Sequence, residues 1–300
     1  PRPPLPHESR PSASGGGQDP GPPARGTSGG AQWNSDMYTA YWKLTRLPFE
    51  SAPDSKFFFE SNGHREGIAR LLFSIQNRKA VVVLTGDYGS GKSVLCQTVL
   101  ERLSPDSFKT ALISNPRMEA VDLIRELALQ FGEEIPSTSR YDVLHAFNSL
   151  LDRCHAAGKH GVAIIDEAQD IANPSVLEDL RLLLNHQIDG VCPLTLVFAG
   201  QTELNGMIRA IPQLYQRVNL KFHIPSLATG EVREYMKHRL ETAGGAIDLF
   251  DPQAVVEVGR LSQCPREINA ICDVALLIAA LNGRPRVSPE DVMESAQERA

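Results

Sequence analysis

A glycine-rich turn ending in lysine and serine carries the clearest chemistry in this sequence of 300 residues. Residues 86–93 read GDYGSGKS, a complete GxxxxGKS/T motif. In such a motif the glycines let backbone N–H groups surround a phosphate, the lysine reaches the β and γ phosphates, and the serine hydroxyl ligates Mg²⁺. We therefore predict a nucleotide-binding loop made of Gly86, Asp87, Tyr88, Gly89, Ser90, Gly91, Lys92, Ser93 and Val94.

Two adjacent carboxylates form the second chemical feature. Asp166 and Glu167 follow the apolar residues 162–165, which are typical of a buried strand. Asp166 is placed to join Ser93 in holding Mg²⁺, and Glu167 is placed to polarise the attacking water as a general base. Helix capping is the alternative for either carboxylate alone. Because a base of this kind hydrolyses ATP, and the sequence lacks a guanine-reading NKxD motif, we predict ATP as the substrate and Mg²⁺ as the metal.

Gln201 is a further candidate, because it follows the apolar stretch 194–199 and Gly200. If this strand lies beside the phosphate loop, the amide can contact the γ-phosphate or the attacking water and act as a sensor. A helix-capping turn is the alternative. His64 starts the helical pattern before the loop, where helix-start packing is favoured over contact with adenine. The aromatic residues 57–59 are interpreted as core or as an interdomain wedge, with a base-stacking platform as the alternative.

Strand and helical patterns alternate around these motifs. Strands are predicted at 80–85, 108–114, 161–166, 194–200 and 218–224. Helices are predicted before the first strand and then at 91–103, 117–131, 139–157, 174–188 and 212–216. Five strands separated by helices predict a P-loop NTPase of the α/β class, with a parallel five-stranded sheet covered by helices on both faces.

The rest of the chain differs in pattern from this region. Residues 1–36 are rich in Pro and Gly with little to bury, and we predict a disordered tail there. Residues 37–225 are assigned to the α/β ATPase core, and residues 226–300 to a helical lid domain. Within this lid, helices are predicted at 229–243, 251–262, 265–281 and 288–299.

Composition excludes several classes of protein. A hydrophobic share of 42% and a charged share of 22% are typical of a globular chain, not of a disordered or collagen-like one. No stretch reaches about 18 uninterrupted apolar residues, so no membrane span is expected. The net charge of -6 gives no electrostatic reason to expect strong binding to DNA. Five cysteines without a CxxC pair are expected to be reduced, as in a cytoplasmic protein. A peripheral position at the inner membrane, through a partner, is the alternative location.

Longer stretches of the sequence resemble a known family. VLTGDYGSGKS, AIIDEAQDI, VFAGQTEL, YQRV and PREINAICDVAL resemble, in this order, the AAA+ ATPases of the general secretion pathway protein A type. The resemblance covers about residues 37–285 and implies a five-stranded AAA+ core, a helical lid and oligomers with nucleotide at subunit boundaries. Carried over by position, Arg217 resembles the arginine finger and Arg266 the sensor arginine of the lid. Gln263 and Cys264 replace the glycine usual in that lid turn.

These features predict an oligomeric ATPase that drives or regulates a secretion, pilus-like or other cell-envelope assembly. Its expected partners are copies of itself and a protein of that assembly. A DNA-dependent ATPase of the transposition-regulator kind is one alternative, although the acidic balance of the chain does not favour DNA. A slow signalling switch that remains ATP-bound is the other.

Overall fold

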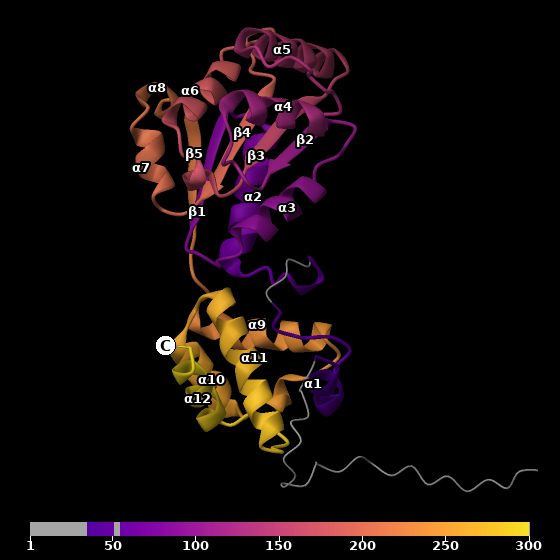
Figure 1. The fold of residues 1–300 in the computed structure, drawn as a ribbon, viewed down its shortest axis with the longest axis vertical. Helices are drawn as coiled ribbons and strands as arrows, with labels where there is room; N and C mark the ends of the chain where they lie inside the picture. Colours follow the sequence, from indigo (N-terminus) through magenta and orange to yellow (C-terminus); the bar gives the residue numbers. More distant parts are fainter. Residues whose placement is uncertain (1–34, 51–54, 300) are drawn as a thin grey trace, which may run out of the picture. The chain divides into compact units, whose positions relative to one another are not determined.

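A five-stranded parallel sheet forms the centre of the α/β region. The computed structural model describes residues 35–50 and 55–299, so nearly all of the predicted tail lies outside the described residues. The strands are β1 (Val81–Gly86), β2 (Phe108–Ile113), β3 (His160–Ile165), β4 (Leu194–Gly200) and β5 (Val218–Ile224). Their order in the sheet is β2-β3-β4-β1-β5, and each neighbouring pair is parallel (Figure 1). The predicted fold class is confirmed.

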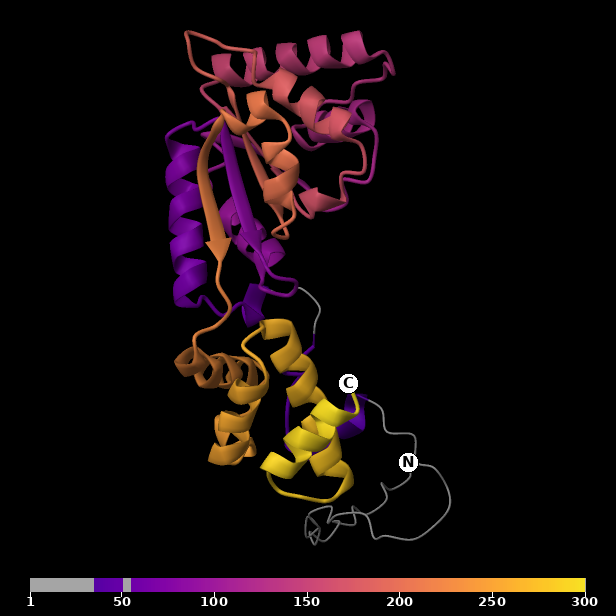
Figure 2. The same ribbon diagram turned by 90° about the vertical axis from the view of Figure 1, so that its left-hand side faces the viewer.

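Side chains alternate between the two faces of the sheet, and each face has its own apolar core. Val82 and Leu84 of β1 point toward α2 (Asn62–Gln76) and α3 (Lys92–Glu101). Val81 and Val83 point toward the other face. The helices on that face are α4 (Ala120–Gln130), α5 (Arg140–Ala156), α6 (Pro174–Leu183), α7 (Leu204–Arg209) and α8 (Pro212–Tyr215) (Figure 2). Coverage on both faces explains why the three central strands β1, β3 and β4 are buried at every position and mostly apolar, whereas the edge strands β2 and β5 also carry polar residues.

Several helix boundaries differ from those predicted. The helix predicted at 117–131 begins at Ala120, and the helix predicted at 174–188 ends at Leu183. Two short helices, α1 (Ser35–Trp42) and α7, were not predicted. With eight and six residues they are too short to show a clear helical periodicity in the sequence.

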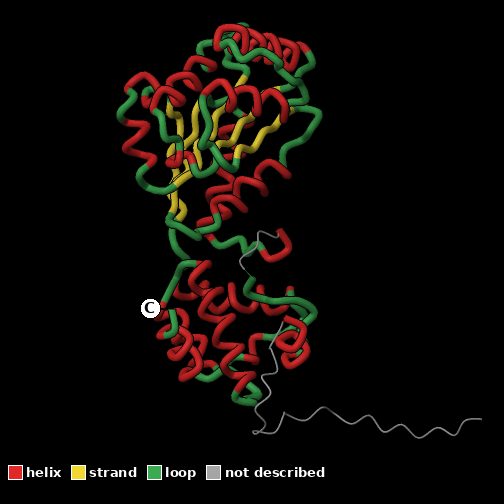
Figure 3. The backbone as a smooth tube through the Cα atoms, viewed as in Figure 1, coloured by secondary structure: helices red, strands yellow, loops and turns green. Residues whose placement is uncertain are grey.

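Helices alone follow β5, as the sequence predicts (Figure 3). They are α9 (Thr229–Thr242), α10 (Pro252–Leu261), α11 (Pro265–Leu281) and α12 (Pro289–Gln297). Three single turns complete the described elements, η1 (Ser55–Phe57), η2 (Ala168–Asp170) and η3 (Ile247–Leu249). Within the described ranges, no helix combines the length and apolarity that a membrane crossing requires.

The segment that contains α1 contacts the C-terminal helices, although the sequence-based boundary groups it with the α/β core. The indole Nε1 of Trp42 donates to the carbonyl of Leu276 on α11 at 3.2 Å. The backbone N–H of Thr45 donates to the carbonyl of Ala243 at 2.8 Å. Because Trp42 is almost fully buried, this contact adds apolar area to the core of the lid. All described residues belong to one compact unit.

Candidate nucleotide site

The predicted phosphate loop joins β1 to α3 with two glycines in conformations that other residues rarely adopt. Gly89 has a φ of 78° and Gly91 a φ of 89°. A Cβ on Gly89 would lie 2.4 Å from the Cβ of Arg266, and one on Gly91 would lie 2.8 Å from Nε2 of His64. Both distances are shorter than van der Waals contact allows, so the loop needs glycine for conformation and for space.

Polar groups of the loop fit an anion. Lys92 is 4% exposed, and its Nζ donates to the carbonyls of Gly86 at 2.8 Å and Asp87 at 2.9 Å. Because an ammonium group has three donors, these bonds leave capacity for a phosphate oxygen. The buried Oγ of Ser90 has no hydrogen-bond partner within the part of the chain that the structure describes. A buried hydroxyl without a partner is costly, which is consistent with a loop shaped for a ligand.

His64 supports the loop from the start of α2. Its Nε2 lies 2.9 Å from the carbonyl of Ser90, and its Nδ1 lies 2.7 Å from the hydroxyl of Ser61. A carbonyl only accepts, so Nε2 carries the proton and Nδ1 accepts from Ser61. Burial lowers the pKa of His64, which favours this neutral form. Its bonds agree with helix-start packing, and the side chain also braces the loop.

The predicted metal ligands are within hydrogen-bonding distance of each other. Asp166 follows β3, is 3% exposed, and accepts a hydrogen bond from the hydroxyl of Ser93. Burial raises the pKa of Asp166, whereas bonds from Ser93 and from the backbone N–H of Glu167 oppose that rise. In residues 35–50 and 55–299 no group of three or more His, Cys, Asp or Glu could hold a metal. A hydroxyl and a carboxylate alone fit Mg²⁺, which takes its remaining ligands from phosphates and water.

Glu167 has a left-handed backbone conformation, with a φ of 49° and a ψ of 39°. This conformation costs free energy in a residue with a Cβ. Glu167 lines the same cavity as Lys92 and Ser93. The carboxylate and the phosphate loop therefore share one space, as the sequence predicts.

That cavity has a volume of about 300 Å³ and is lined by residues from both the α/β region and the C-terminal helices. Its aromatic wall includes Phe59 and Tyr235, whose ring centroids are 5.9 Å apart. The hydroxyl of Tyr235 donates to Oδ1 of the buried Asn269 at 2.6 Å. Burial raises the pKa of Tyr235 to about 12, so it remains a neutral donor. Apolar and aromatic walls with a few polar groups are typical of a small-molecule site.

Arg239 of α9 ties the N-terminal segment to this wall. The side chain is 6% exposed, and it donates to the carbonyls of Pro48 and Glu50, each at 2.6 Å. The guanidinium carbon also lies 4.6 Å from the centre of the Phe57 ring. Residues before β1 and residues after β5 are thereby joined beside the cavity.

Arg266 reaches the cavity from the first turn of α11. Its guanidinium carbon lies 4.3 Å from the ring centre of Tyr88, which is 57% exposed. Beside it, the thiol of Cys264 donates to the carbonyl of Tyr88 at 3.2 Å. The lid arginine thus contacts a side chain of the phosphate loop, and the turn with Cys264 in place of the usual glycine packs directly on that loop.

Gln201 and Arg217 lie at two other places. Gln201 follows β4, which pairs with β1 through Thr85 and Gly200, so its predicted position beside the loop strand is confirmed. Its backbone N–H donates to Oε1 of Gln169 at 2.9 Å. Arg217 lies between α8 and β5, where its guanidinium donates to Oδ1 of Asn185. The residues that line the described cavity do not include Arg217.

Comparison with known proteins agrees with this geometry. Residues 75–208 match the model of the family described as AAA domain. This part of the chain is similar to an AAA domain, in agreement with the AAA+ fold. It is 35% identical over 268 residues to general secretion pathway protein A of Aeromonas hydrophila, covering 87% of this chain and 48% of that protein. The chain therefore spans about half the length of that relative, and the resemblance predicted from the sequence is confirmed.

Solved structures show the same AAA+ fold. The ORC2 protein of Aeropyrum pernix, in complexes with ADPNP and ADP, is 19% identical with a TM-score of 0.66, over 84% of this chain and 71% of its own. The ORC1 protein of Aeropyrum pernix in complex with DNA is 20% identical with a TM-score of 0.66, over 86% and 70%. At these identities the likeness describes the fold alone.

Some residues of this AAA+ site were not assigned from the sequence. Tyr235, Asn269 and Arg239 belong to the lid and read as ordinary core or surface positions of helices. Gln169 was noted only as part of the DEAQ stretch. Asn269 lies in the PREIN stretch, of which only Arg266 was given a role. Tyr235, Asn269 and Arg239 all meet the cavity through packing between segments far apart in the chain, which local sequence does not reveal.

Proposed function

We propose that this AAA+ chain binds ATP and hydrolyses it to ADP and phosphate with Mg²⁺. The observation that carries the proposal is the cavity shared by the phosphate loop and Glu167, with Asp166 bonded to Ser93 at its edge. In this proposal Gly86–Val94 hold the phosphates through backbone N–H groups, and Lys92 adds a buried cation.

Catalysis is assigned to the edge of the cavity formed by Glu167. Its carboxylate accepts a proton from the attacking water, which makes the oxygen a better nucleophile. Mg²⁺ held by Ser93 and Asp166 would neutralise charge on the β and γ phosphate oxygens. Gln201, at the end of β4, is proposed to sense the γ-phosphate.

Two arginines are proposed to act from outside the loop. Arg266 leaves the Tyr88 ring for the γ-phosphate when nucleotide is bound, because a trianionic phosphate attracts a guanidinium more strongly than an aromatic face does. Arg217 is proposed to act as a finger on the nucleotide of a neighbouring copy. Its position away from the chain's own cavity supports action in trans.

The proposed cellular role comes from the similarity to general secretion pathway protein A. General secretion pathway protein A points to an oligomeric ATPase that drives or regulates a secretion-type assembly of the cell envelope through a protein partner. A DNA-dependent ATPase is the second candidate, because two structural neighbours, Drosophila ORC and the ORC1 protein of Aeropyrum pernix, were solved with DNA. The net charge of -6 favours the first.

Two measurements test these proposals. Glu167→Gln should keep ATP affinity and stop turnover, because the water loses its base while the phosphate site is unchanged. Turnover within about threefold of the wild type would remove Glu167 from this role. ATPase rates with and without duplex DNA at physiological salt then separate the two cellular roles, since strong stimulation would favour the DNA-dependent ATPase.

A further inference from the structure

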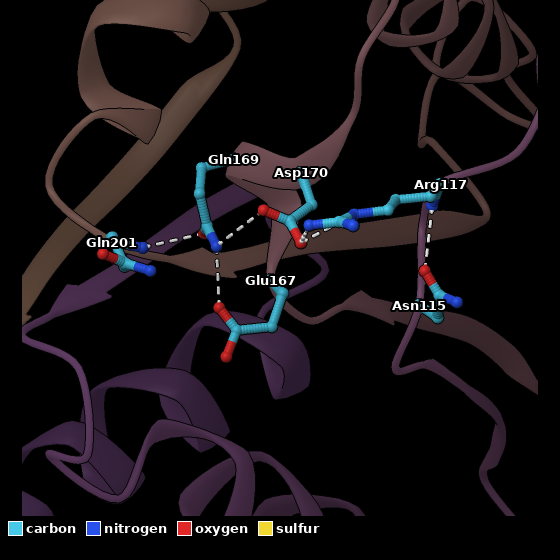
Figure 4. Close-up of polar contacts among 6 residues, drawn as sticks. All are labelled: Asn115, Arg117, Glu167, Gln169, Asp170 and Gln201. Carbon is cyan, nitrogen blue, oxygen red and sulfur yellow. Dashed lines mark hydrogen bonds and ion pairs between the residues drawn. The ribbon is translucent and has the colours of Figure 1, made fainter.

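The side chain of Gln169, in the η2 turn after the two carboxylates, forms hydrogen bonds in two directions (Figure 4). Its Oε1 accepts from the backbone N–H of Gln201 at 2.9 Å. Its Nε2 donates to Oε2 of Glu167 at 2.7 Å. One amide thereby connects the end of β4 to the carboxylate that lines the nucleotide cavity.

The backbone of Gln201 determines which way this amide faces. A backbone N–H can only donate, so the oxygen of the Gln169 amide must face Gln201. The NH₂ group must then face Glu167. The backbone N–H of Gln201, just after β4, therefore fixes the NH₂ group of Gln169 on the side of Glu167. The opposite orientation of the amide would satisfy neither Gln201 nor Glu167.

The absence of a side chain at Gly200 leaves space for the amide. A Cβ on Gly200 would lie 2.4 Å from Oε1 of Gln169, so a larger residue there would displace the amide from this position. The backbone of Glu167 has a left-handed conformation, which helps to set the direction in which its side chain leaves the turn. The direction of its carboxylate is therefore set from both ends.

We infer that Gln169 is the positioning residue for the general base, and that it transmits the position of the β4 end to Glu167. The inference rests on the proposed role of Glu167. The cavity is lined by Glu167 and not by Gln169, so Gln169 acts through the carboxylate. Movement of Gln201 on contact with a γ-phosphate would move the amide and redirect the base.

Asp170 provides a second acceptor for the same NH₂ group, which carries two hydrogens. Its Oδ1 lies 3.4 Å from Nε2 of Gln169, compared with 2.7 Å for Glu167. Arg117, just after β2, donates to Oδ2 of Asp170 through Nε at 3.1 Å and Nη2 at 2.8 Å. The ion pair offsets the charge on Asp170, so Glu167 remains the preferred acceptor.

Two substitutions separate the bonds of Gln169. Gln169→Met keeps the length of the side chain and removes both bonds. Gln169→Glu keeps an oxygen for the N–H of Gln201 but places a second carboxylate against Glu167. Both should lower kcat about 10- to 100-fold, the loss expected for a misplaced catalytic group, with KM for ATP changed less than about twofold.

Gln130 offers a matched control on α4. Its Oε1 accepts from the backbone N–H of Leu112 at 2.7 Å, and its Nε2 donates to Glu126 at 2.8 Å. Gln130→Met therefore removes the same two kinds of bond, and also a bond from Nε2 to the carbonyl of Leu112 at 3.2 Å, from a place whose residues do not line the cavity. It should leave kcat at the wild-type value.

A double-mutant cycle on the full chain decides the question. If Gln169 acts through Glu167, adding Gln169→Met to Glu167→Gln should leave the residual single-turnover rate unchanged. A further fall would indicate a general structural defect and would overturn the inference. Wild-type kcat in Gln169→Met, with turnover lost in Glu167→Gln, would overturn the inference alone. Normal turnover in Glu167→Gln would overturn both the inference and the assignment of the base.

Discussion

The phosphate loop and the lid side of the cavity contribute to one site in different ways. The loop is contiguous, because nine neighbouring residues carry its glycines, its cation and its hydroxyl. The lid side is assembled from distant segments, as when Arg239 bonds the carbonyl of Pro48 across 191 positions of the chain. A contiguous site tolerates change elsewhere, whereas an assembled site depends on the packing of every segment that reaches it.

Lys92→Ala tests the contiguous part and should have the largest effect. It removes the buried ammonium that bonds two loop carbonyls, so ATP binding should fall by at least about 100-fold, as expected for a charge-assisted contact with phosphate. Nucleotide titration measures the affinity. Lys159→Ala is the control, because Lys159 also donates to a backbone carbonyl, that of Pro105 at 2.8 Å, from an exposed position. Near wild-type affinity in Lys92→Ala would contradict the proposed loop.

Arg217→Ala tests whether the nucleotide site includes a residue from a second copy of the chain. It should keep ATP binding and lower turnover by roughly 10- to 1000-fold, scaled down from the gains known for arginine fingers. Arg153→Ala, which removes an exposed guanidinium paired with Glu133, should keep the wild-type rate.

A mixing experiment defines the geometry of this finger. Alone, Glu167→Gln subunits should not turn over and Arg217→Ala subunits should keep only the reduced rate given above. Together they should recover some activity, because a mixed interface pairs an intact Glu167 with an intact Arg217. If crosslinking confirms mixed oligomers and no ratio restores turnover, Arg217 does not act in trans.

The same contrast explains how much of the molecule was predictable. The central strands β1, β3 and β4 were predictable because burial on both faces makes them mostly apolar, whereas the edge strand β5 alternates apolar and polar residues. The order of helices followed from their periodicity. The motifs 86–94 and 166–167 were predicted to lie together because each is local and sits at a strand end, and the structure places Lys92, Ser93 and Glu167 around one cavity. Parallel strands bring their carboxyl ends to one edge of the sheet, so these motifs meet without long-range information.

The remaining residues needed the tertiary structure. Gln169 belongs to a recognised stretch, but its function depends on which backbone N–H faces it, and that is set by the neighbouring β4. The contact of Arg266 with Tyr88 depends on how α11 approaches the loop. Side chains such as Trp42 were grouped with the core because composition does not reveal the partner of an aromatic residue.

Gly89→Ala tests the contact between the two regions. The substitution strains a backbone with a φ of 78° and pushes against the Cβ of Arg266 at 2.4 Å. Gly158→Ala strains a similar backbone, with a φ of 75°, but its Cβ meets nothing within 4 Å. Both should lose about 1–2 kcal/mol of unfolding free energy, whereas only Gly89→Ala should lose about tenfold in ATP affinity. Equal affinities in the two variants would show that the lid does not respond to the loop.

Arg117→Ala should have the smallest effect. The side chains of Arg117 and Asp170 are 69% and 33% exposed, and exposed ion pairs contribute about 0–1 kcal/mol to stability. Without the guanidinium, the carboxylate of Asp170 competes more strongly for the Gln169 amide, so kcat should fall about two- to threefold. Salt weakens the wild-type pair, and the difference between the two proteins should therefore narrow at about 1 M salt.

Arg260→Ala is the matched control for this prediction, since Arg260 is also 69% exposed and lies 2.7 Å from the carboxylate of Glu257 on α10. It removes a comparable ion pair that, in the described structure, is not linked to Glu167 through hydrogen bonds. Steady-state rates of the two variants at low and high salt measure the difference. Equal rates would mean that Asp170 does not draw the amide of Gln169 away from Glu167. A lower rate seen only in Arg117→Ala and only at low salt would show that Arg117, on the surface after β2, also influences the site.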